Sequence, residues 1–346
     1  MFSTISNMPD LSGRPLLATR RDAERFVGHQ QAARVLTDAI EHDYNVAVFG
    51  RRGSGKSSLL HVADHSLRDR RRMVFIDASV VGDAASFLQL VRFRLGLAPT
   101  PAETVRDSFS GMFRPQRPPT DVSDLLYVLE ALRADSEADE DPTPMTLLVD
   151  DLDPHVGNTV FGRLRNELWS LRYRWVVAAE EDARQALLTA PADSFFDVVI
   201  ELEPLSIAEL VELLKARADG ETIDEDLARE VAELADGNPR RLLALAREAI
   251  LGGVDADDLA ATRARLVERI EHLSPSARML FEELEVRGQA SASDENLLKR
   301  FGWSRQRARR VFEELEQAGL VVAQSERGQR PGRPRKVYAL ADRAPA

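Results

Sequence analysis

The sequence predicts an α/β fold in which a parallel β-sheet, covered by helices on both faces, precedes a small helical unit and a C-terminal helix-turn-helix with two strands. Three observations carry this prediction. Short apolar runs alternate with helix-length segments over residues 46–200. A glycine-rich turn follows the first of these runs. After Pro204 the apolar runs stop and helical periodicity takes over.

The predicted strands are five apolar runs. Strands of a parallel sheet are buried on both faces, so they appear as nearly continuous apolar stretches. The runs are 46–49, 73–76, 145–149, 175–179 and 198–200. Two intervening segments, the proline-containing residues 97–120 and the acidic residues 135–144, are predicted to be loops or insertions within the same domain.

The helical unit after the sheet is predicted from three amphipathic segments, 206–216, 224–235 and 240–250. A connecting helix is expected near residues 255–272. The predicted organisation is therefore a tail, a sheet core, a helical lid, a linker helix and a C-terminal domain. Their bounds are 1–20, 21–204, 205–254, 255–272 and 273–346.

Composition restricts the classes of protein to consider. Of the 346 residues, 44% are hydrophobic and 30% are charged, which is typical of a globular chain. The absence of cysteine excludes disulfides, thiolate zinc sites and cysteine nucleophiles. Residues 1–17 do not have the pattern of a signal peptide, and no stretch reaches the apolar length of a membrane span. We therefore expect a cytoplasmic protein without a membrane partner.

The glycine-rich turn fits the phosphate-binding pattern G-x-x-x-x-G-K-[ST]. It follows a predicted strand and opens a predicted helix, which is the context that this loop, the P-loop, requires. Its backbone N–H groups and the positive end of the helix favour phosphate oxygens. Lys56 is expected to reach the β- and γ-phosphates, and Ser57 to ligate Mg²⁺. The predicted nucleotide-binding residues of the loop are Gly50, Gly53, Ser54, Gly55, Lys56, Ser57 and Ser58.

Two acids follow the third predicted strand. A strand that ends in acids beside a P-loop supplies the other half of a nucleotide site. Asp150 is predicted to hold Mg²⁺, directly or through water. Asp151 is predicted to orient or deprotonate the attacking water. The cofactors predicted from these residues are ATP and Mg²⁺, and the predicted activity is that of an ATPase.

The chain resembles the AAA+ and STAND group of P-loop ATPases, and within it the branch that contains the archaeal and eukaryotic origin-recognition initiators. Residues 25–29, Arg-Phe-Val-Gly-His, are similar to the R-F-V-G-R box that precedes the P-loop in that group. The resemblance implies that Phe26 and Val27 contact adenine. It covers residues 20–255, and it extends to the C-terminus because initiators also end in a winged helix.

The lid carries the second motif of the resemblance. Residues 237–241, Gly-Asn-Pro-Arg-Arg, are similar to the family's G-x-P-R motif. The resemblance implies that Arg240, or as second choice Arg241, touches the γ-phosphate as the sensor 2 residue.

The chain departs from the family pattern in the residues that support catalysis. Asp151 stands where the family usually has glutamate, and its shorter side chain implies slow hydrolysis. The polar sensor 1 position falls on Glu180, an acid that would repel a γ-phosphate. An arginine finger that acts on a neighbouring subunit is expected from the helix before the fourth strand. Arg172 is the first choice, ahead of Arg165 and Arg174, and ordinary surface roles remain an alternative for all three.

The C-terminal end differs in charge from the rest of the chain. Residues 299–336 contain eleven basic and four acidic residues, whereas the whole chain has a net charge of −11. A localised basic region indicates contact with a polyanion. Ser304 is expected to cap a helix with one apolar stripe, and basic residues in its first two turns are typical of a DNA recognition helix. The residues expected to face DNA are Arg305, Gln306, Arg309 and Arg310.

Two short apolar runs, 321–323 and 337–340, predict the strands of a wing and complete a winged helix-turn-helix. The loop between them, residues 330–336, resembles the AT-hook core, which lies in the minor groove of A·T-rich DNA. A narrow minor groove concentrates negative potential and attracts arginine. The resemblance implies that Arg333 enters this groove. Arg330, Arg335 and Lys336 are expected along the phosphates, and a protein-docking winged helix is the alternative.

The sequence therefore predicts an ATP-dependent protein that binds double-stranded DNA, with an ATPase switch of initiator or DNA-loading type. A homo-oligomer through the ATPase core is a further expectation. The alternatives are a STAND-type transcriptional or defence regulator in which ATP gates oligomerisation, and a DNA-binding module with a purely structural nucleotide. A small-molecule kinase is disfavoured by the lid arginine and the basic end.

Overall fold

The computed structural model divides the chain into two compact units, residues 1–256 and 257–346. It describes residues 10–79, 81–96, 122–139, 143–218, 223–252, 272–287, 289–294, 301–326 and 335–340, together with residues 270, 297 and 298. The predicted loop at 97–120 and almost all of the predicted linker helix at 255–272 lie outside these residues. No helix among the described residues has the length and apolar character needed to cross a bilayer.

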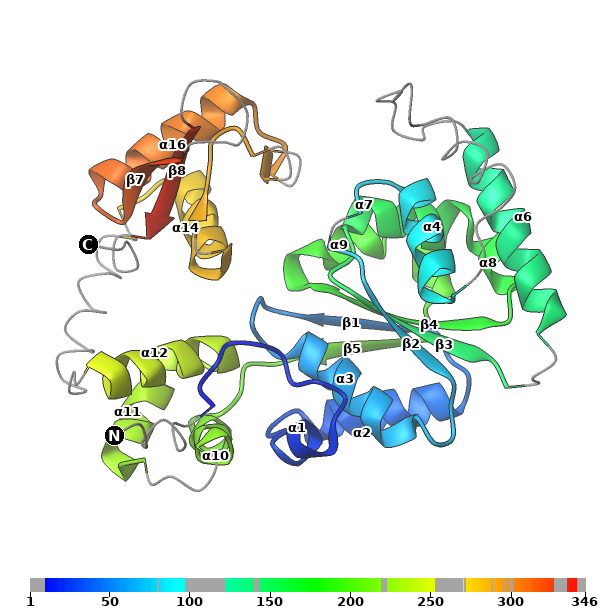
Figure 1. The fold of residues 1–346 in the computed structure, drawn as a ribbon, viewed down its shortest axis with the longest axis horizontal. Coiled ribbons are helices and arrows are strands. Elements are labelled where there is room, and N and C mark those ends of the chain that lie inside the picture. Colours follow the sequence, from blue (N-terminus) through cyan, green and yellow to red (C-terminus); the bar gives the residue numbers. More distant parts are fainter. Residues whose placement is uncertain are drawn as a thin grey trace, which may run out of the picture. The chain divides into compact units, whose positions relative to one another are not determined.

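The first unit is built on a five-stranded parallel sheet (Figure 1). All five predicted strands are present, and their order in the sheet is β2-β3-β4-β1-β5. Every pairing is parallel, so the carboxyl ends of all five strands meet at one edge. The strands are β1 (Val46–Gly50), β2 (Met73–Asp77), β3 (Met145–Asp150), β4 (Tyr173–Glu180) and β5 (Val198–Leu202).

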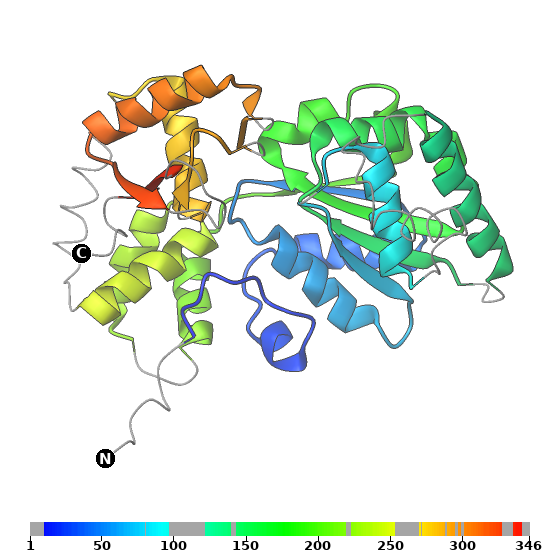
Figure 2. The same ribbon diagram turned by 45° about the horizontal axis from the view of Figure 1, so that its top comes forward.

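Helices cover both faces of this sheet (Figures 1 and 2). Along β1, Val46 and Val48 pack into the core on one face, whereas Ala47 and Phe49 pack into the core on the other. This alternation explains why the strand is apolar throughout. One face is covered by α1 (Arg20–Glu24), α2 (Gln30–Glu41) and α3 (Lys56–Leu67).

The opposite face carries the remaining helices of the core. They are α4 (Ala84–Arg94), α6 (Val122–Ala138), α7 (Pro154–Gly157), α8 (Arg165–Trp169) and α9 (Arg184–Leu187), with shorter helical turns η1 (Asn158–Arg163), η2 (Glu181–Ala183) and η3 (Ala192–Phe195). Because α6 runs to Ala138, the predicted gap at 135–144 is wrong in its first residues. Leu132 and Ser136 of α6 are buried. Packing against the core therefore extends this helix into a segment whose acidic sequence indicates a loop.

The lid consists of the three predicted helices, α10 (Ile207–Arg217), α11 (Glu225–Ala235) and α12 (Pro239–Gly252). Ser206 caps α10 in a capping box with Glu209, and Asp224 caps α11. The chain turns between α11 and α12 at Gly237, whose φ of 72° is in the left-handed region. An added Cβ there would lie 2.4 Å from the Cβ of Pro204, so this turn packs tightly against the end of the sheet domain.

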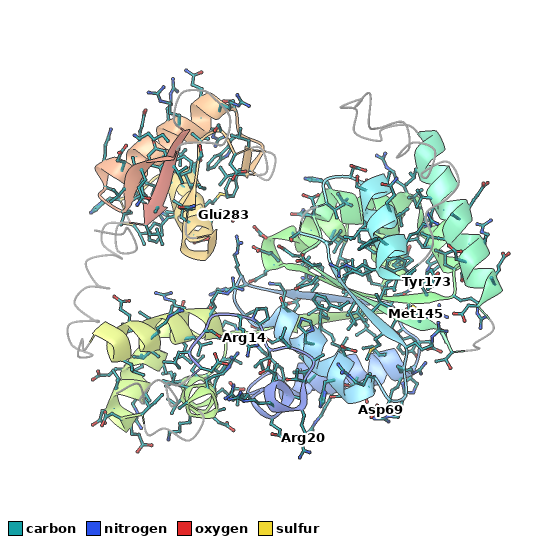
Figure 3. The ribbon with its side chains drawn as sticks, in the orientation of Figure 1. Arg14, Arg20, Asp69, Met145, Tyr173 and Glu283 are labelled. Carbon is teal, nitrogen blue, oxygen red and sulfur yellow. The ribbon has the colours of Figure 1, made fainter. Side chains whose placement is uncertain are left out.

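Residues 10–19 are part of the first unit, although the sequence assigns them to a tail. Leu11 and Leu16 are buried. The Asp10 N–H donates to the carbonyl of Arg217 in α10 at 3.1 Å. The Leu16 N–H donates to the hydroxyl of Ser58 in α3 at 3.0 Å. This segment therefore connects the lid with the helix that follows the P-loop, and Figure 3 labels Arg14 on it.

The second unit has its own apolar core. Its elements are α14 (Pro275–Arg287), β6 (Gln289–Ala290), α16 (Arg305–Gln317), β7 (Val321–Glu326) and β8 (Arg335–Leu340). The strands form an antiparallel sheet in the order β6-β8-β7. Phe312 of α16 stacks on Tyr338 of β8, with ring centroids 4.4 Å apart. The assignment of this unit as a winged helix stays a prediction.

Candidate functional site

The loop between β1 and α3 needs glycine at two positions. Gly53 and Gly55 have φ of 81° and 106°, which side chains rarely adopt. At Gly53 an added Cβ would lie 2.7 Å from Oδ1 of Asn238 and 2.9 Å from Cβ of Arg240. The turn that begins α12 therefore rests directly on the loop. Gly50 ends β1, where a Cβ would lie 2.6 Å from the hydroxyl of Ser54.

Each backbone carbonyl from Gly50 to Ser54 accepts a hydrogen bond. The Lys56 ammonium donates to Gly50 at 2.8 Å and Arg51 at 3.1 Å. The other three carbonyls meet groups from outside the loop. These contacts are Asn238 Nδ2 to Arg52 at 2.7 Å, the Arg240 N–H to Gly53 at 3.4 Å, and His29 Nε2 to Ser54 at 3.0 Å. With the carbonyls engaged in this way, the loop can direct its N–H groups toward an anion.

Lys56 lies among acidic side chains. Burial lowers the pKa of its ammonium group, and the charges of Glu180, Asp150 and Asp151 act in the opposite direction. The three carboxylates therefore offset part of the effect of burial on the pKa of Lys56. Lys56 is the position at which the sequence predicts contact with the β- and γ-phosphates.

The predicted metal ligands lie together at the carboxyl edge of the sheet. Asp150 ends β3, and burial raises the pKa of its carboxyl group while a hydrogen bond with Ser57 lowers it. Asp77 of β2 pairs in register with Asp150 and adds a second acid. Asp151 is exposed and has a φ of 55°, a conformation that aspartate tolerates better than most residues.

Arg240 approaches the same acids from the lid. Burial and the neighbouring Arg52 lower the pKa of its guanidinium, whereas the charges of Glu180, Asp151 and Asp150 raise it. Its Cγ lies 3.8 Å from where a Cβ on Gly13 would be. The predicted sensor 2 residue is therefore close to the phosphate loop and to the N-terminal segment.

Glu180, the sensor 1 position, ends β4 and pairs in register with Gly50. Its carboxylate lies 3.7 Å from the Nε of Arg52, and the next acid, Glu181, lies 3.6 Å from the Nε of Arg51. Two arginines of the loop thus meet the acid that ends β4 and the acid that follows it. The sequence predicts that Glu180 would repel a γ-phosphate. The positive charges of Arg52 and Lys56 near its carboxylate offset this repulsion.

The remaining predicted nucleotide residues lie in different places. Phe26 and Val27 are half-buried, and Phe26 packs against the core under α2 and α3. The hydroxyl of Ser58 accepts a hydrogen bond from the N–H of Leu16. Arg172 precedes β4, at the opposite edge of the sheet from the P-loop, and donates to the carbonyl of Asp139 at 2.8 Å. Its role as an arginine finger stays a prediction.

The second unit presents a basic helix surface. Arg305, Gln306, Arg309 and Arg310 are all exposed, and the opposite side of α16 is buried through Ala308, Val311, Phe312 and Leu315. The Nε of Arg309 donates to Glu313 at 2.8 Å, and this bond raises the pKa of the arginine. Glu314 accepts from the N–H and the hydroxyl of Ser274 at 2.7 and 2.8 Å. This contact fixes α16 against the start of α14.

The predicted wing is described only in part. Arg330 and Arg333 lie outside the described residues, and Arg335 is described only as backbone at the start of β8. Lys336 is exposed and forms an ion pair with Glu316 at 3.0 Å. Its ammonium also lies 4.7 Å from the ring centroid of Tyr338. Hydrogen bonds with Tyr338 and Glu316 raise the pKa of this lysine.

No protein-family model matches the chain. It is 29% identical over 220 residues to the Holliday junction branch migration complex subunit RuvB of two Wolbachia, the wRi strain from Drosophila simulans and Wolbachia pipientis wMel. The match covers 62% of this chain and 56% of those proteins. The chain thus spans little more than half the length of these relatives.

One similar solved structure is that of the Aeropyrum pernix Orc1 protein in complex with DNA. It is 16% identical, covers 94% of this chain and 93% of that chain, and has a TM-score of 0.53. The chain has the fold of an AAA+ P-loop ATPase. In this chain the P-loop, Asp150 and the start of α12 lie at one edge of the sheet.

The sequence interpretation missed three contacts of the AAA+ core. His29 and Asn238 belong to the two family-like motifs, but the sequence predicts no role for either residue. In the structure both side chains bind carbonyls of the P-loop. The Arg52–Glu180 pair was also missed. Each contact joins segments that are far apart in the sequence, and the left-handed φ of 53° at His29 leaves no clear signal in the residue type.

Proposed function

We propose that this protein is an ATP-dependent DNA-binding protein, in which a slow ATPase acts as a switch of initiator or DNA-loading type. The observation that carries the proposal is the meeting of Lys56, Ser57, Asp150 and the lid's Arg240 around one P-loop. The comparisons support a DNA-related role, since one similar structure is a complex with DNA and the curated relatives belong to a branch migration complex.

The residues of the site fit ATP with Mg²⁺. A Cβ at Gly53 would collide with the lid turn, and the loop carbonyls are engaged, which suits a cradle of N–H groups for phosphates. Ser57 and Asp150, already joined by a hydrogen bond, offer the oxygen ligands that Mg²⁺ prefers. Bound Mg²⁺ would neutralise charge on the phosphates. Phe26 and Val27 would contact the base.

In the proposed reaction Asp151 orients or deprotonates the attacking water. Its carboxylate is one methylene shorter than that of glutamate, which supports slow hydrolysis. Lys56 and Arg240 would hold the phosphates and the developing charge. An arginine finger from a neighbouring subunit, with Arg172 as first candidate, would complete a homo-oligomeric site.

The second unit would bind double-stranded DNA. The exposed side of α16, with Arg305, Gln306, Arg309 and Arg310, suits the major groove. The wing would follow the phosphates through Arg330, Arg335 and Lys336, with Arg333 in the minor groove. A regulator in which ATP gates oligomerisation, with the winged helix as a protein-docking domain, remains the alternative.

The first experiment tests nucleotide binding by thermal unfolding of the full chain. ATP with Mg²⁺ at about 1,000 times its Kd should stabilise the first unit by about 4 kcal/mol. Lys56→Ala should abolish most of this increase, because it removes the cation expected at the β- and γ-phosphates. An unchanged ATP-dependent shift in Lys56→Ala would contradict the site assignment.

The second experiment measures DNA binding by the full chain across a salt series, with and without ATP. Replacing Arg335 and Lys336 together by alanine should flatten the log–log salt slope by about 2, because each phosphate contact contributes about 0.9. Arg333→Ala should weaken binding to A·T-rich sites more than to G·C-rich sites. A full chain without salt-dependent DNA affinity would favour the regulator.

A further inference from the structure

Two side chains hold the P-loop from outside, and neither has a place in the proposed chemistry. His29 Nε2 lies 3.0 Å from the carbonyl oxygen of Ser54, and Asn238 Nδ2 lies 2.7 Å from that of Arg52. A carbonyl oxygen only accepts, so the His29 ring must carry its proton on Nε2. Both contacts fix peptide groups of a loop that owes its shape to glycine.

The direction of a carbonyl determines the direction of the next N–H. In a trans peptide the C=O of one residue and the N–H of the next point in opposite directions. When His29 holds the Ser54 carbonyl, the Gly55 N–H points away from His29. When Asn238 holds the Arg52 carbonyl, the Gly53 N–H points away from the lid turn. Glycines at 53 and 55 would otherwise let these peptides rotate at little cost.

His29 is placed for this contact by the backbone before α2. Gly28 and His29 have φ of 77° and 53°, so two successive residues are left-handed. An added Cβ on Gly28 would lie 2.5 Å from a methyl carbon of Leu205, which fixes the turn against the entry to the lid. His29 precedes α2, and its side chain makes no capping hydrogen bond to that helix, so the ring can bind the loop. Burial lowers the pKa of the ring.

Asn238 connects the loop to the lid. Its Oδ1 accepts from the Arg241 N–H at 3.2 Å at the start of α12, while its Nδ2 donates to Arg52. One amide group therefore caps a lid helix and orients a loop peptide. A rotation of α12 would move this amide, and the Gly53 N–H would lose its fixed direction.

We propose that His29 and Asn238 are positioning residues that hold the P-loop N–H groups of Gly55 and Gly53 in the direction required for phosphate, and that Asn238 thereby couples the lid to phosphate affinity. This inference rests on the proposed binding of ATP. Phosphate affinity becomes dependent on the lid through a neutral amide, in addition to the charge of Arg240.

The test uses full-length variants that keep the local backbone. Asn tolerates the left-handed region, so His29→Asn retains the turn but is too short to reach Ser54. Serine is a good helix cap, so Asn238→Ser retains the start of α12 but lacks the amide donor. The matched controls are His42→Asn and Asn158→Ser, whose parent side chains bind the carbonyls of Asp38 and Thr189 away from the loop.

Each test variant should bind ATP and ADP about five- to tenfold more weakly, the loss expected for one hydrogen bond that supports binding. Competition by inorganic tripolyphosphate, which probes the phosphate loop without the base, should weaken by a similar factor. Melting without nucleotide should stay within about 2 °C of the wild type, a shift of under about 1 kcal/mol. His29→Gln, whose amide can reach the same carbonyl, should recover part of the affinity.

Wild-type affinities for ATP and tripolyphosphate in both His29→Asn and Asn238→Ser would overturn the inference, provided that Lys56→Ala loses ATP binding. Asn238→Asp supplies a second check, because it keeps the cap but opposes the Arg52 carbonyl with an acceptor, and it should bind more weakly than Asn238→Ser. Equal affinity in the two would also contradict the proposal. A wild-type chain that binds no ATP would refute the proposed function and the inference with it.

Discussion

Replacement of Gly53 by alanine tests how closely the lid rests on the P-loop. The φ of 81° would cost a side chain about 1–2 kcal/mol. The new methyl would lie 2.7 Å from Asn238 Oδ1 and 2.9 Å from Arg240 Cβ, and relief of such crowding costs about 1–3 kcal/mol. A loss of about 3 kcal/mol should lower the melting temperature of the first unit by about 6–12 °C.

The assay is thermal unfolding of the full chain with and without ATP and Mg²⁺, followed through the transition that ATP shifts. Gly53→Ala should also lose most of the ATP-dependent increase, because the displaced lid turn carries Arg240. Gly82→Ala is the matched control, since an added Cβ there meets no atom within 4 Å. If Gly53→Ala melted like the wild type with an intact ATP shift, the lid turn would not rest on the loop and the reasoning above would be refuted.

Three further predictions concern other residues. Asp151→Asn should abolish ATP hydrolysis but keep the ATP-dependent melting shift, because Ser57 and Asp150 remain; hydrolysis at the wild-type rate would redirect attention to Glu180. Glu313→Gln should release Arg309 and remove an acid from the proposed DNA surface. DNA affinity should therefore rise, and the log–log salt slope should steepen by up to about 0.9. Unchanged DNA binding would argue against this surface. Glu314→Ala should cost the second unit about 2 kcal/mol of unfolding free energy in urea, because it removes two hydrogen bonds to Ser274; a loss below about 0.5 kcal/mol would contradict their role.

The sheet and the lid were predictable because their signals are local. Strands buried on both faces are apolar throughout, and residues Val46–Phe49 are both apolar and buried. Two of the lid helices, α10 and α11, are preceded by Ser206 and Asp224, whose side chains cap them. The P-loop motif likewise predicts its own geometry, because its left-handed residues at positions 53 and 55 require glycine.

Contacts between distant segments could not be predicted in this way. Asn238 and Arg52 are 186 positions apart, and the sequence around Asn238 only announces a helix start. Residues 10–19 contain Gly13, Pro15 and four polar or charged side chains, which gives them the composition of a tail. Their backbone hydrogen bonds reach Ser58 in α3 and Arg217 in α10, which lie far along the chain.

Glu180, the acid at the end of β4, shows how the fold compensates a charge that the sequence alone makes unfavourable. Alone, Glu180 would repel a phosphate. In the structure it lies near Arg52, and its charge, with those of Asp150 and Asp151, balances the cations Lys56, Arg52 and Arg240. Counted as charged, these three acids and three cations balance, and Asp77 beside Asp150 adds a further acid. Affinity for phosphate at such a site must therefore depend strongly on fixed N–H dipoles, and this makes the groups that orient the P-loop peptides as important as the charges around them.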